Sequence, residues 1–219
     1  METIELLKLS MINQIKVFIQ GVRLRNIFIA LLCCLITLHK IDNYQVVTAL
    51  ISIIIIILLM ISSNLINDIY DIKTDSINKP NRALIKNPEK EKGFQGVAFF
   101  CSFAALLLAL FLNYKAFLII VFSLPILILY TPVFKGIPLV GNVIVAFYLS
   151  LVFIFIELSL TGDISIMIVP AIFAFGISLI REIIKDVEDY KGDQLAGIYT
   201  LSIYIGIPRT IKFTVLLIL

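Results

Sequence analysis

Long apolar runs constrain this chain more than any other feature. Residues 46–66 and 94–112 are each long enough, as a helix, to cross the hydrocarbon core of a bilayer, which takes about 20 residues. The mean hydropathy is +1.06, and a soluble domain of this size could not bury so much apolar surface. Further apolar runs cover 26–39, 116–130, 139–156, 166–180 and 213–219. We therefore predict an all-α, multi-pass transmembrane bundle with about seven spans.

The sequence does not favour a β-fold, a nucleic-acid partner or a cysteine metal site. The Ile-rich runs exceed the usual 4–8 residues of a strand, and they lack the alternation that a membrane barrel requires. The formal net charge is only +3, which gives no indication of a nucleic-acid partner. The three cysteines lie in apolar runs without metal-binding spacing, so we interpret them as buried hydrophobic residues. Membrane lipids are therefore the expected surroundings, and the sequence makes no prediction of oligomeric state.

Lysine and arginine are distributed very unequally between the connecting segments. If the N-terminus is cytoplasmic, only Lys40 and Lys115 of the 18 basic residues fall on the opposite side. Cytoplasmic segments of membrane proteins carry such an excess of positive charge. We therefore predict a cytoplasmic N-terminus, with the long segments 67–93 and 181–212 on the cytoplasmic side. Because these are the longest polar connections, we expect the functional site there.

The sequence stops inside its last apolar run. A natural terminus of a membrane protein normally reaches water beyond the last span. The expectation is a single transmembrane domain over residues 1–219 that is truncated at its C-terminal end.

The first acidic cluster directly follows the second span. Asn67, Asp71 and Asp75 have the spacing i, i+4, i+8, which on a helix places them along one face over about 12 Å. Asp68 directly follows the first member of this row, and Pro80 ends the helical pattern. The sequence therefore predicts a row of oxygen ligands at the membrane surface.

The second acidic cluster follows the sixth span on the same predicted side. Asp186, Asp189 and Asp193 have the spacing i, i+3, i+7, which again defines one helical face. Like charges at this spacing repel, and acids near hydrocarbon are costly, so a compensating cation is expected. Carboxylates suit Mg²⁺, which usually also binds substrate phosphates. The basic residues that could contact those phosphates directly are Lys79, Arg82, Lys185 and Lys191.

The simpler explanation is that both clusters are ordinary charged helix ends at a membrane surface. Such ends are common for a single cluster. Two clusters in matching register, on one predicted side, favour the functional interpretation.

These motifs resemble the UbiA superfamily of intramembrane prenyltransferases. The family's first signature resembles Asn67-Asp68-x-x-Asp71-x-x-x-Asp75 followed by Asn78-Lys79-Pro80-x-Arg82. Its second signature resembles Asp186-x-x-Asp189-x-x-x-Asp193. The region between the two signatures in the family resembles Tyr130-Thr-Pro-x-x-Lys135 and Gly141-Asn142. The resemblance covers most of the chain. It implies a nine-helix fold, of which about seven helices are present.

The resemblance also implies an activity and a set of site residues. Members of the family take a prenyl diphosphate and a lipophilic acceptor. The implied Mg²⁺–diphosphate ligands are Asn67, Asp71, Asp75, Asp189 and Asp193, with Asp68 and Asp186 as catalytic helpers. Tyr70, Tyr130 and Tyr190 are candidates to stabilise an allylic cation. The expected substrate-binding residues are Lys79, Arg82, Tyr130, Lys135, Asn142, Arg181, Lys185 and Lys191.

Within the family, the segment from Asp71 to Arg82 is most similar to the digeranylgeranylglyceryl phosphate synthase branch. That branch transfers geranylgeranyl to geranylgeranylglyceryl phosphate in ether-lipid synthesis. Ala83 departs from the Pro that commonly follows the arginine. Prenylation of an aromatic acceptor, in quinone or chlorophyll-type synthesis, is the alternative within the family. A CDP-alcohol phosphotransferase would carry one continuous Asp-rich signature, and a cation transporter would place acids near mid-bilayer.

Overall fold

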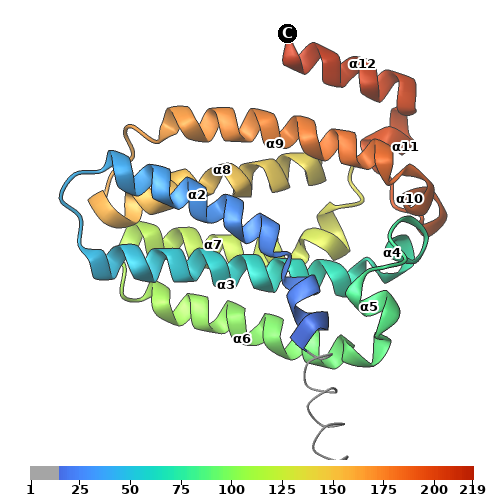
Figure 1. Ribbon diagram of the computed structural model, residues 1–219. Helices are drawn as coiled ribbons and strands as arrows, with labels where there is room; N and C mark the ends of the chain where they lie inside the picture. Colours follow the sequence, from blue (N-terminus) through green and yellow to red (C-terminus); the bar gives the residue numbers. More distant parts are fainter. Residues whose placement is uncertain (1–14) are drawn as a thin grey trace, which may run out of the picture.

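The computed structural model describes residues 15–219, and this part of the chain is a bundle of helices without strands (Figure 1). The all-α prediction is thereby confirmed. A short helix, Ile15–Val22, precedes the others. The following helices are α2 (Leu24–Lys40), α3 (Val46–Tyr70), α4 (Ile72–Asn78), α5 (Ala83–Lys86), η1 (Pro88–Lys90), α6 (Glu91–Ala109), α7 (Tyr114–Leu129), η2 (Tyr130–Phe134), α8 (Val140–Thr161), α9 (Ile168–Glu188), α10 (Tyr190–Ala196), α11 (Leu201–Ile205) and α12 (Ile207–Ile218). The predicted cytoplasmic segment 1–14 lies outside the described residues.

By length and composition, four helices of the described chain could cross a membrane: α3, η1 with α6, α7 with η2, and α8. A fifth span results if Ile15–Val22 and α2, which meet at an angle of 50°, are counted together. The prediction of about seven spans also counted α9 and α12. Helix α9 is 21 residues long, but charged side chains occupy its last two turns, and α12 has only 12 residues.

Large apolar side chains cover the outside of the bundle. Phe99 and Phe111 are each 73% exposed, and Phe122 and Phe173 are nearly as open. In water such a surface would be strongly unfavourable, whereas lipid tails solvate it at no cost. The exposed surface therefore supports the transmembrane prediction.

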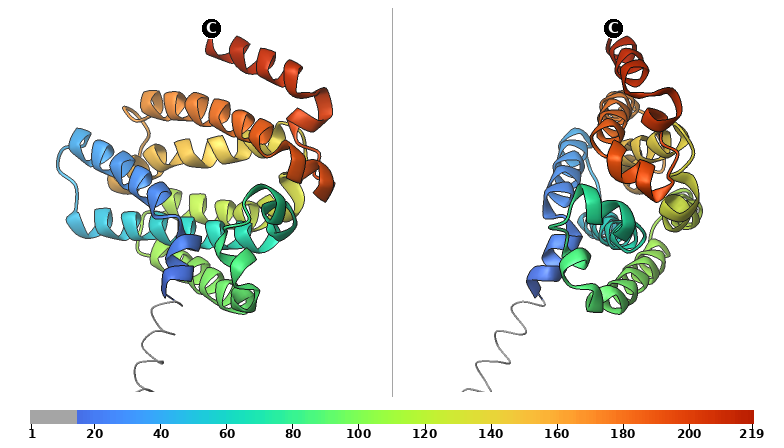
Figure 2. Two further views of the ribbon diagram at one scale, coloured as in Figure 1. Left: turned by 45° about the vertical axis from the view of Figure 1, so that its right-hand side comes forward. Right: turned by 90° about the vertical axis from the view of Figure 1, so that its right-hand side faces the viewer.

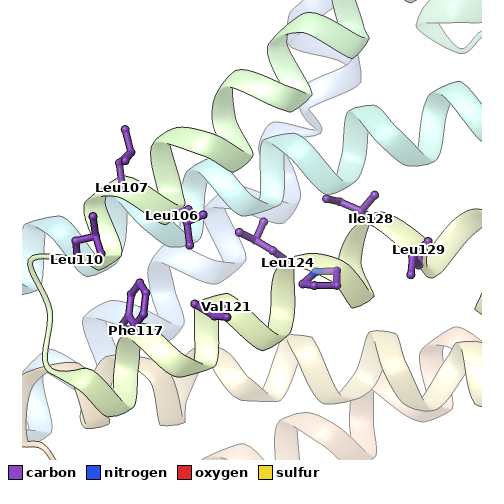
Figure 3. A pocket seen from close by; sticks show the side chains of 9 residues that line it. Leu106, Leu107, Leu110, Phe117, Val121, Leu124, Ile128 and Leu129 are labelled. Carbon is purple, nitrogen blue, oxygen red and sulfur yellow. The ribbon is translucent and has the colours of Figure 1, made fainter.

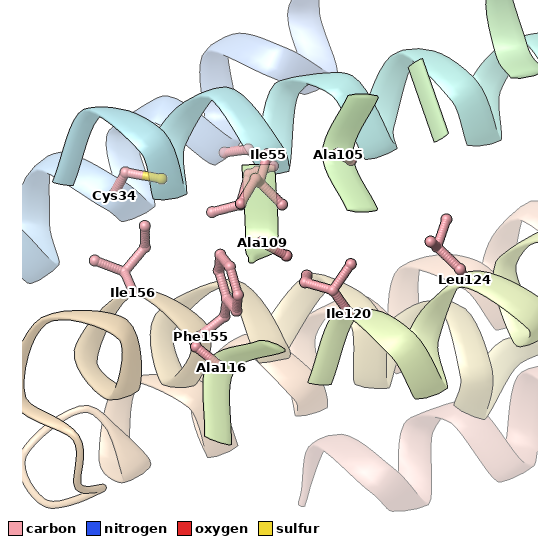
Figure 4. Packing of buried hydrophobic residues seen from close by; sticks show 11 residues of the cluster. Cys34, Ile55, Ala105, Ala109, Ala116, Ile120, Leu124, Phe155 and Ile156 are labelled. Carbon is pink, nitrogen blue, oxygen red and sulfur yellow. The ribbon is translucent and has the colours of Figure 1, made fainter. Parts of the chain in front are cut away.

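Small residues and hydroxyl groups join the helices inside the bundle. Ala105 and Ala109 of α6 allow close approach to Ile55 of α3 and Phe155 of α8, and these side chains turn toward one another (Figure 4). The hydroxyl groups of Ser62 and Ser102 also form a hydrogen bond of 2.7 Å between α3 and α6. Small residues and hydroxyl bonds are how helices associate where no hydrophobic effect separates them from lipid.

At one end of the bundle, α3 and α9 each give way to a short seven-residue helix (Figure 1). The junction residues are Asp71, with φ −86° and ψ 7°, and Asp189, with φ −85° and ψ 3°. Each predicted acidic row therefore bends at its central aspartate, so neither row lies on one continuous helix as expected. The short helices α4 and α10 pack against each other at this end, which faces the viewer in the right panel of Figure 2.

At the opposite end, Glu157 fixes the connection between α8 and α9. Its buried carboxylate accepts hydrogen bonds from the backbone N–H groups of Ser165, Ile166 and Met167, at 2.9–3.2 Å, and from the Ser165 hydroxyl. A single side chain thus provides the hydrogen-bond acceptors for the donors of the loop that leads into α9.

Glu157→Gln is expected to destabilise the fold. The amide offers one acceptor oxygen where the loop presents four donors, and hydrogen bonds to charged groups contribute about 1.5–3 kcal/mol. Thermal unfolding in detergent should show a lower midpoint than wild type. Asp163→Asn is the matched control, because that carboxylate lies in the same loop but is 83% exposed. Equal midpoints for Glu157→Gln and the control would contradict this role.

Candidate active site

The two bent acidic segments enclose a polar cleft at the end of the bundle where α4 and α10 meet. The cleft lies between α3, α4, η2, α8, α9 and α10, and its volume is only about 40 Å³. It is lined by Arg23, Asn67, Asp71, Thr74, Asp75, Asn78, Lys79, Arg82, Tyr130, Lys135, Gly141, Asn142, Glu182, Lys185, Asp186, Asp189 and Asp193. Residues from both sequence signatures therefore meet in one site.

Most residues singled out from the sequence line this cleft. Among the predicted metal ligands, helpers and substrate-binding residues, the three that do not are Asp68, Arg181 and Lys191. Of the candidate tyrosines, Tyr130 lines the cleft, whereas Tyr70 and Tyr190 do not. Tyr70 is 57% exposed, so the structure offers no support for a role of that ring beside a reacting carbon.

The two signatures share one pattern, D-x-x-D-x-x-x-D, in Asp68–Asp75 and Asp186–Asp193. In both, the central aspartate stands where the long helix ends, and its carbonyl accepts the backbone N–H of the third aspartate, at 2.7 Å in the first and 3.1 Å in the second. The bend turns the short helix across the end of the bundle. As a result, the second and third aspartates of each pattern face the same cleft.

Lysines hold the central aspartates from the opposite side of the cleft. Lys79, which follows α4, forms an ion pair of 2.5 Å with Asp189. Lys135, at the end of η2, forms an ion pair with Asp71. These pairs compensate the charges of the two central carboxylates.

Asp68, the first aspartate of its pattern, has a different environment. Its side chain is 2% exposed and pairs with Arg23 and, at 2.6 Å, with Arg82. Arg82 also approaches Asp75 at 3.7 Å. The structure therefore places Asp68 behind the cleft, where it pairs with two arginines and would act on a bound group only through them.

The equivalent Asp186 does line the cleft, and Asn142 of α8 donates to it at 2.8 Å. One turn earlier on α9, the buried Glu182 accepts from Arg181 at 2.6 Å and from Lys185 at 2.9 Å. Asn142 and Lys185 are thus fixed at the wall where they were expected, and Arg181 lies just outside it.

Asn78 joins the two halves of the site, although the sequence analysis gave it no role. Its side-chain amide donates to the backbone carbonyl of Asp189 at 2.8 Å, and its oxygen accepts the backbone N–H of Gly192 at 3.0 Å. Its spacing of three residues from Asp75 was the available signal, because it places both on one helical face. The sequence analysis also gave no role to Arg23, Thr74 and Glu182, which line the cleft. It gave none to Thr131 either, whose hydroxyl donates a hydrogen bond to the Asn67 side chain.

Burial dominates the electrostatics of the third aspartates. Burial raises the pKa of Asp193 to about 6; Lys135 opposes this, and the nearby acids Asp186, Asp189 and Asp71 add to it. Burial likewise raises the pKa of Asp75, against the attraction of Arg82. These carboxylates take up a proton more readily than exposed ones do, so in acid a proton would compete with a cation for them.

The donor set fits a magnesium ion. Among the described residues, no three acidic, histidine or cysteine side chains converge tightly enough to hold a metal by themselves. Mg²⁺ usually needs only one or two carboxylates, with water and substrate phosphates completing its shell. The amide of Asn67 and the carboxylates of the two patterns supply oxygen ligands of that kind.

Metal-dependent ligand binding at this cleft should weaken in acid. Metal ligands must be deprotonated, and with a pKa of about 6 Asp193 is ionised at pH 7 but mostly protonated at pH 5. The affinity for inorganic diphosphate in the presence of Mg²⁺ should fall as pH drops from 7 to 5, by up to about tenfold per unit below pH 6. Titration calorimetry at pH 5, 6 and 7 measures this.

Asp193→Asn is the control for that titration, because the diphosphate itself also takes up protons in this range. The variant should bind more weakly at pH 7 and show a flatter pH dependence. An identical slope in wild type and variant would contradict a contribution from Asp193.

The fold is a helical membrane bundle, and two matching acidic signatures form a cleft at one of its ends. This combination defines a class of intramembrane proteins that bind a charged group beside the lipid phase. The chain belongs to the UbiA prenyltransferase family, whose sequence pattern matches residues 26–219.

Several relatives carry the same name. The digeranylgeranylglyceryl phosphate synthase of Natronomonas pharaonis is 37% identical over 152 residues, which are 68% of this chain and 54% of that protein. The synthase of that name from Sulfurisphaera tokodaii is 28% identical over 200 residues, which are 90% of this chain and 72% of that protein. The chain thus spans about half of the first relative's length.

Solved structures agree on the fold. A UbiA homologue from Archaeoglobus fulgidus, bound to DMAPP and Mg²⁺, superposes with a TM-score of 0.77 at 21% identity, covering 91% of this chain and 73% of that one. A structure described as that of digeranylgeranylglyceryl phosphate synthase gives a TM-score of 0.70 at 28% identity and covers 93% of this chain and 73% of the other.

Proposed function

We propose that this chain carries out Mg²⁺-dependent transfer of a geranylgeranyl group from its diphosphate to geranylgeranylglyceryl phosphate. The observation that carries the proposal is the meeting of the two D-x-x-D-x-x-x-D patterns in one cleft at the end of a membrane bundle. The names of the relatives support the choice of acceptor. The positive-inside distribution of basic residues supports a cytoplasmic location for the cleft.

The metal ligands in this proposal are Asn67, Asp71, Asp75, Asp189 and Asp193. When bound, Mg²⁺ neutralises the charge that develops on a departing diphosphate. Lys79 and Lys135 now pair with Asp189 and Asp71, and they are placed to donate to phosphate oxygens once those carboxylates bind a cation. Arg82 is held by Asp68 for the same purpose.

The prenyl chain needs an apolar path that starts at the cleft. A groove of about 640 Å³ runs between α6 and α7 and is lined only by apolar side chains, from Leu107 and Leu110 to Leu129 (Figure 3). Leu129 directly precedes Tyr130, which lines the polar cleft. Because α7 ends at Leu129 and η2 begins at Tyr130, this adjacency in the chain supports a prenyl chain lying along α7 with its diphosphate at the acidic end, where the Tyr130 ring would face the allylic carbon.

A product assay tests the proposal. The detergent-purified protein is given geranylgeranyl diphosphate, Mg²⁺ and one acceptor at a time: geranylgeranylglyceryl phosphate, 4-hydroxybenzoate, a dihydroxynaphthoate or homogentisate. Mass spectrometry should detect the doubly prenylated glyceryl phosphate, and EDTA should abolish it. Prenylation of an aromatic acceptor alone would move the activity to quinone-type synthesis. No product, together with no Mg²⁺-dependent binding of the diphosphate, would favour a cation transporter.

A further inference from the structure

One basic cluster in the site belongs to neither acidic pattern. Glu182 of α9 is buried, with a side chain that is 5% exposed, and it pairs with the much more exposed Arg181 and Lys185. A buried carboxylate thus holds two cationic groups that both remain partly exposed. Of the three residues, Glu182 and Lys185 line the polar cleft and Arg181 lies just outside it.

The other basic residues of the cleft are committed to the acidic patterns. Lys79 pairs with Asp189, Lys135 with Asp71, and both Arg23 and Arg82 with Asp68. In the part of the chain that the structure describes, the ion pairs of Arg181 and Lys185 lead only to Glu182. The site therefore has two groups of cations, one among the carboxylates and one beside them.

The charges of this second group suit a phosphate. Two cations and one carboxylate leave a net charge of +1 at the rim of the cleft. Arginine has five N–H donors and the lysine ammonium three, and a phosphate monoester accepts several of them at once. Because Glu182 already holds one Nη of Arg181 and the Nζ of Lys185, less rotamer freedom would be lost when an anion binds.

We propose that Arg181 and Lys185, held by Glu182, bind the phosphate monoester of the lipid acceptor. This inference rests on the proposed function and assigns the second phosphate-bearing substrate a site of its own. In a glyceryl phosphate the reacting hydroxyl is only one glycerol unit from the phosphate, so that phosphate must lie at the rim of the same cleft. Lys185 lies at that rim. The diphosphate of the donor would bind to the other group of cations, which lies among the carboxylates.

The test separates the two substrates by their Michaelis constants. In Arg181→Gln and in Lys185→Gln, the KM for geranylgeranylglyceryl phosphate should rise about tenfold or more, because a charge-assisted hydrogen bond is lost. The KM for geranylgeranyl diphosphate should stay within about twofold of wild type. Arg209→Gln and Lys212→Gln are matched controls, because both residues are exposed on α12, which packs against α9 outside the cleft.

Geranylgeranylglycerol, which lacks the phosphate, gives a second readout. Wild type should strongly prefer the phosphorylated acceptor, and both variants should lose most of that preference. Arg181→Lys, which keeps the charge, should restore part of it. Phosphatidylglycerol added to the assay distinguishes the acceptor from a general lipid headgroup, and it should raise the acceptor KM of wild type only slightly.

Several results would overturn the inference. These are an unchanged acceptor KM in both variants, a rise in the donor KM instead, or strong competition by phosphatidylglycerol. Product formation by wild type with an unchanged acceptor KM in the variants would overturn this inference and leave the proposed function standing. No product from wild type with any acceptor would overturn both.

Discussion

Turnover should fall by at least about 100-fold in Asp71→Asn and in Asp189→Asn, the two substitutions at the central positions of the acidic patterns. Each removes one carboxylate at a helix junction and changes the shape of the side chain very little. The carboxylate is the group that would bind the metal, and an amide binds a divalent cation far more weakly. The product assay with geranylgeranyl diphosphate measures the loss.

The fold should survive both substitutions. Asp71→Asn leaves Lys135 without its ionic partner, and Asp189→Asn does the same to Lys79. Both lysines are partly exposed at the polar end of the bundle, where water can solvate the ammonium group. Size-exclusion profiles should match wild type. Asp42→Asn is the control, because that carboxylate is exposed and lies in the loop between α2 and α3. Near-normal turnover in either variant would refute the assignment of these ligands.

Gly192→Ala should disrupt the contact between α4 and α10 and lower turnover by about 10- to 100-fold. A Cβ atom at position 192 would lie 2.3–2.7 Å from the side-chain amide of Asn78, which is closer than any real contact. The amide cannot turn away without losing its bonds to Asp189 and Gly192. Displacing the second signature by about 1 Å is enough to cost up to 100-fold in rate.

A double-mutant cycle identifies the cause of that loss. Asn78→Ala removes the same two bonds, so the double variant Asn78→Ala/Gly192→Ala should be hardly worse than either single variant. Gly96→Ala is the matched control, because no atom lies within 4 Å of a Cβ atom added there. Fully additive losses would mean that Gly192 acts through another contact.

The sequence was sufficient for the fold class and for most of the cleft. Apolar run lengths predicted the bundle, and the spacing of Asp71 and Asp75, and of Asp189 and Asp193, predicted which side chains meet. These signals are local, and they depend only on helical periodicity and on the thickness of a bilayer. The two signatures lie more than 100 residues apart, and their position on one predicted side was the link between them.

The remaining features depend on contacts distant in sequence. Neither junction carries a glycine or proline at the bend, so nothing in the sequence indicated that the helices end at Asp71 and Asp189. The pairing of Asp68 with Arg23 joins residues 45 positions apart, and no periodicity encodes it. For the same reason the sequence left open whether Asp68 contacts a bound group directly, and packing buries it behind the wall of the cleft.

The lysine pairs at the two junctions make the resting site a self-neutralised one. Lys79 and Lys135 act as internal counterions of Asp189 and Asp71, so the protein itself compensates the charge of both carboxylates. A cation arriving alone would have to displace an ammonium group that then has no anion to bind. A diphosphate arriving alone would meet carboxylates. Cation and diphosphate should therefore each strengthen the binding of the other, by the same factor in both directions.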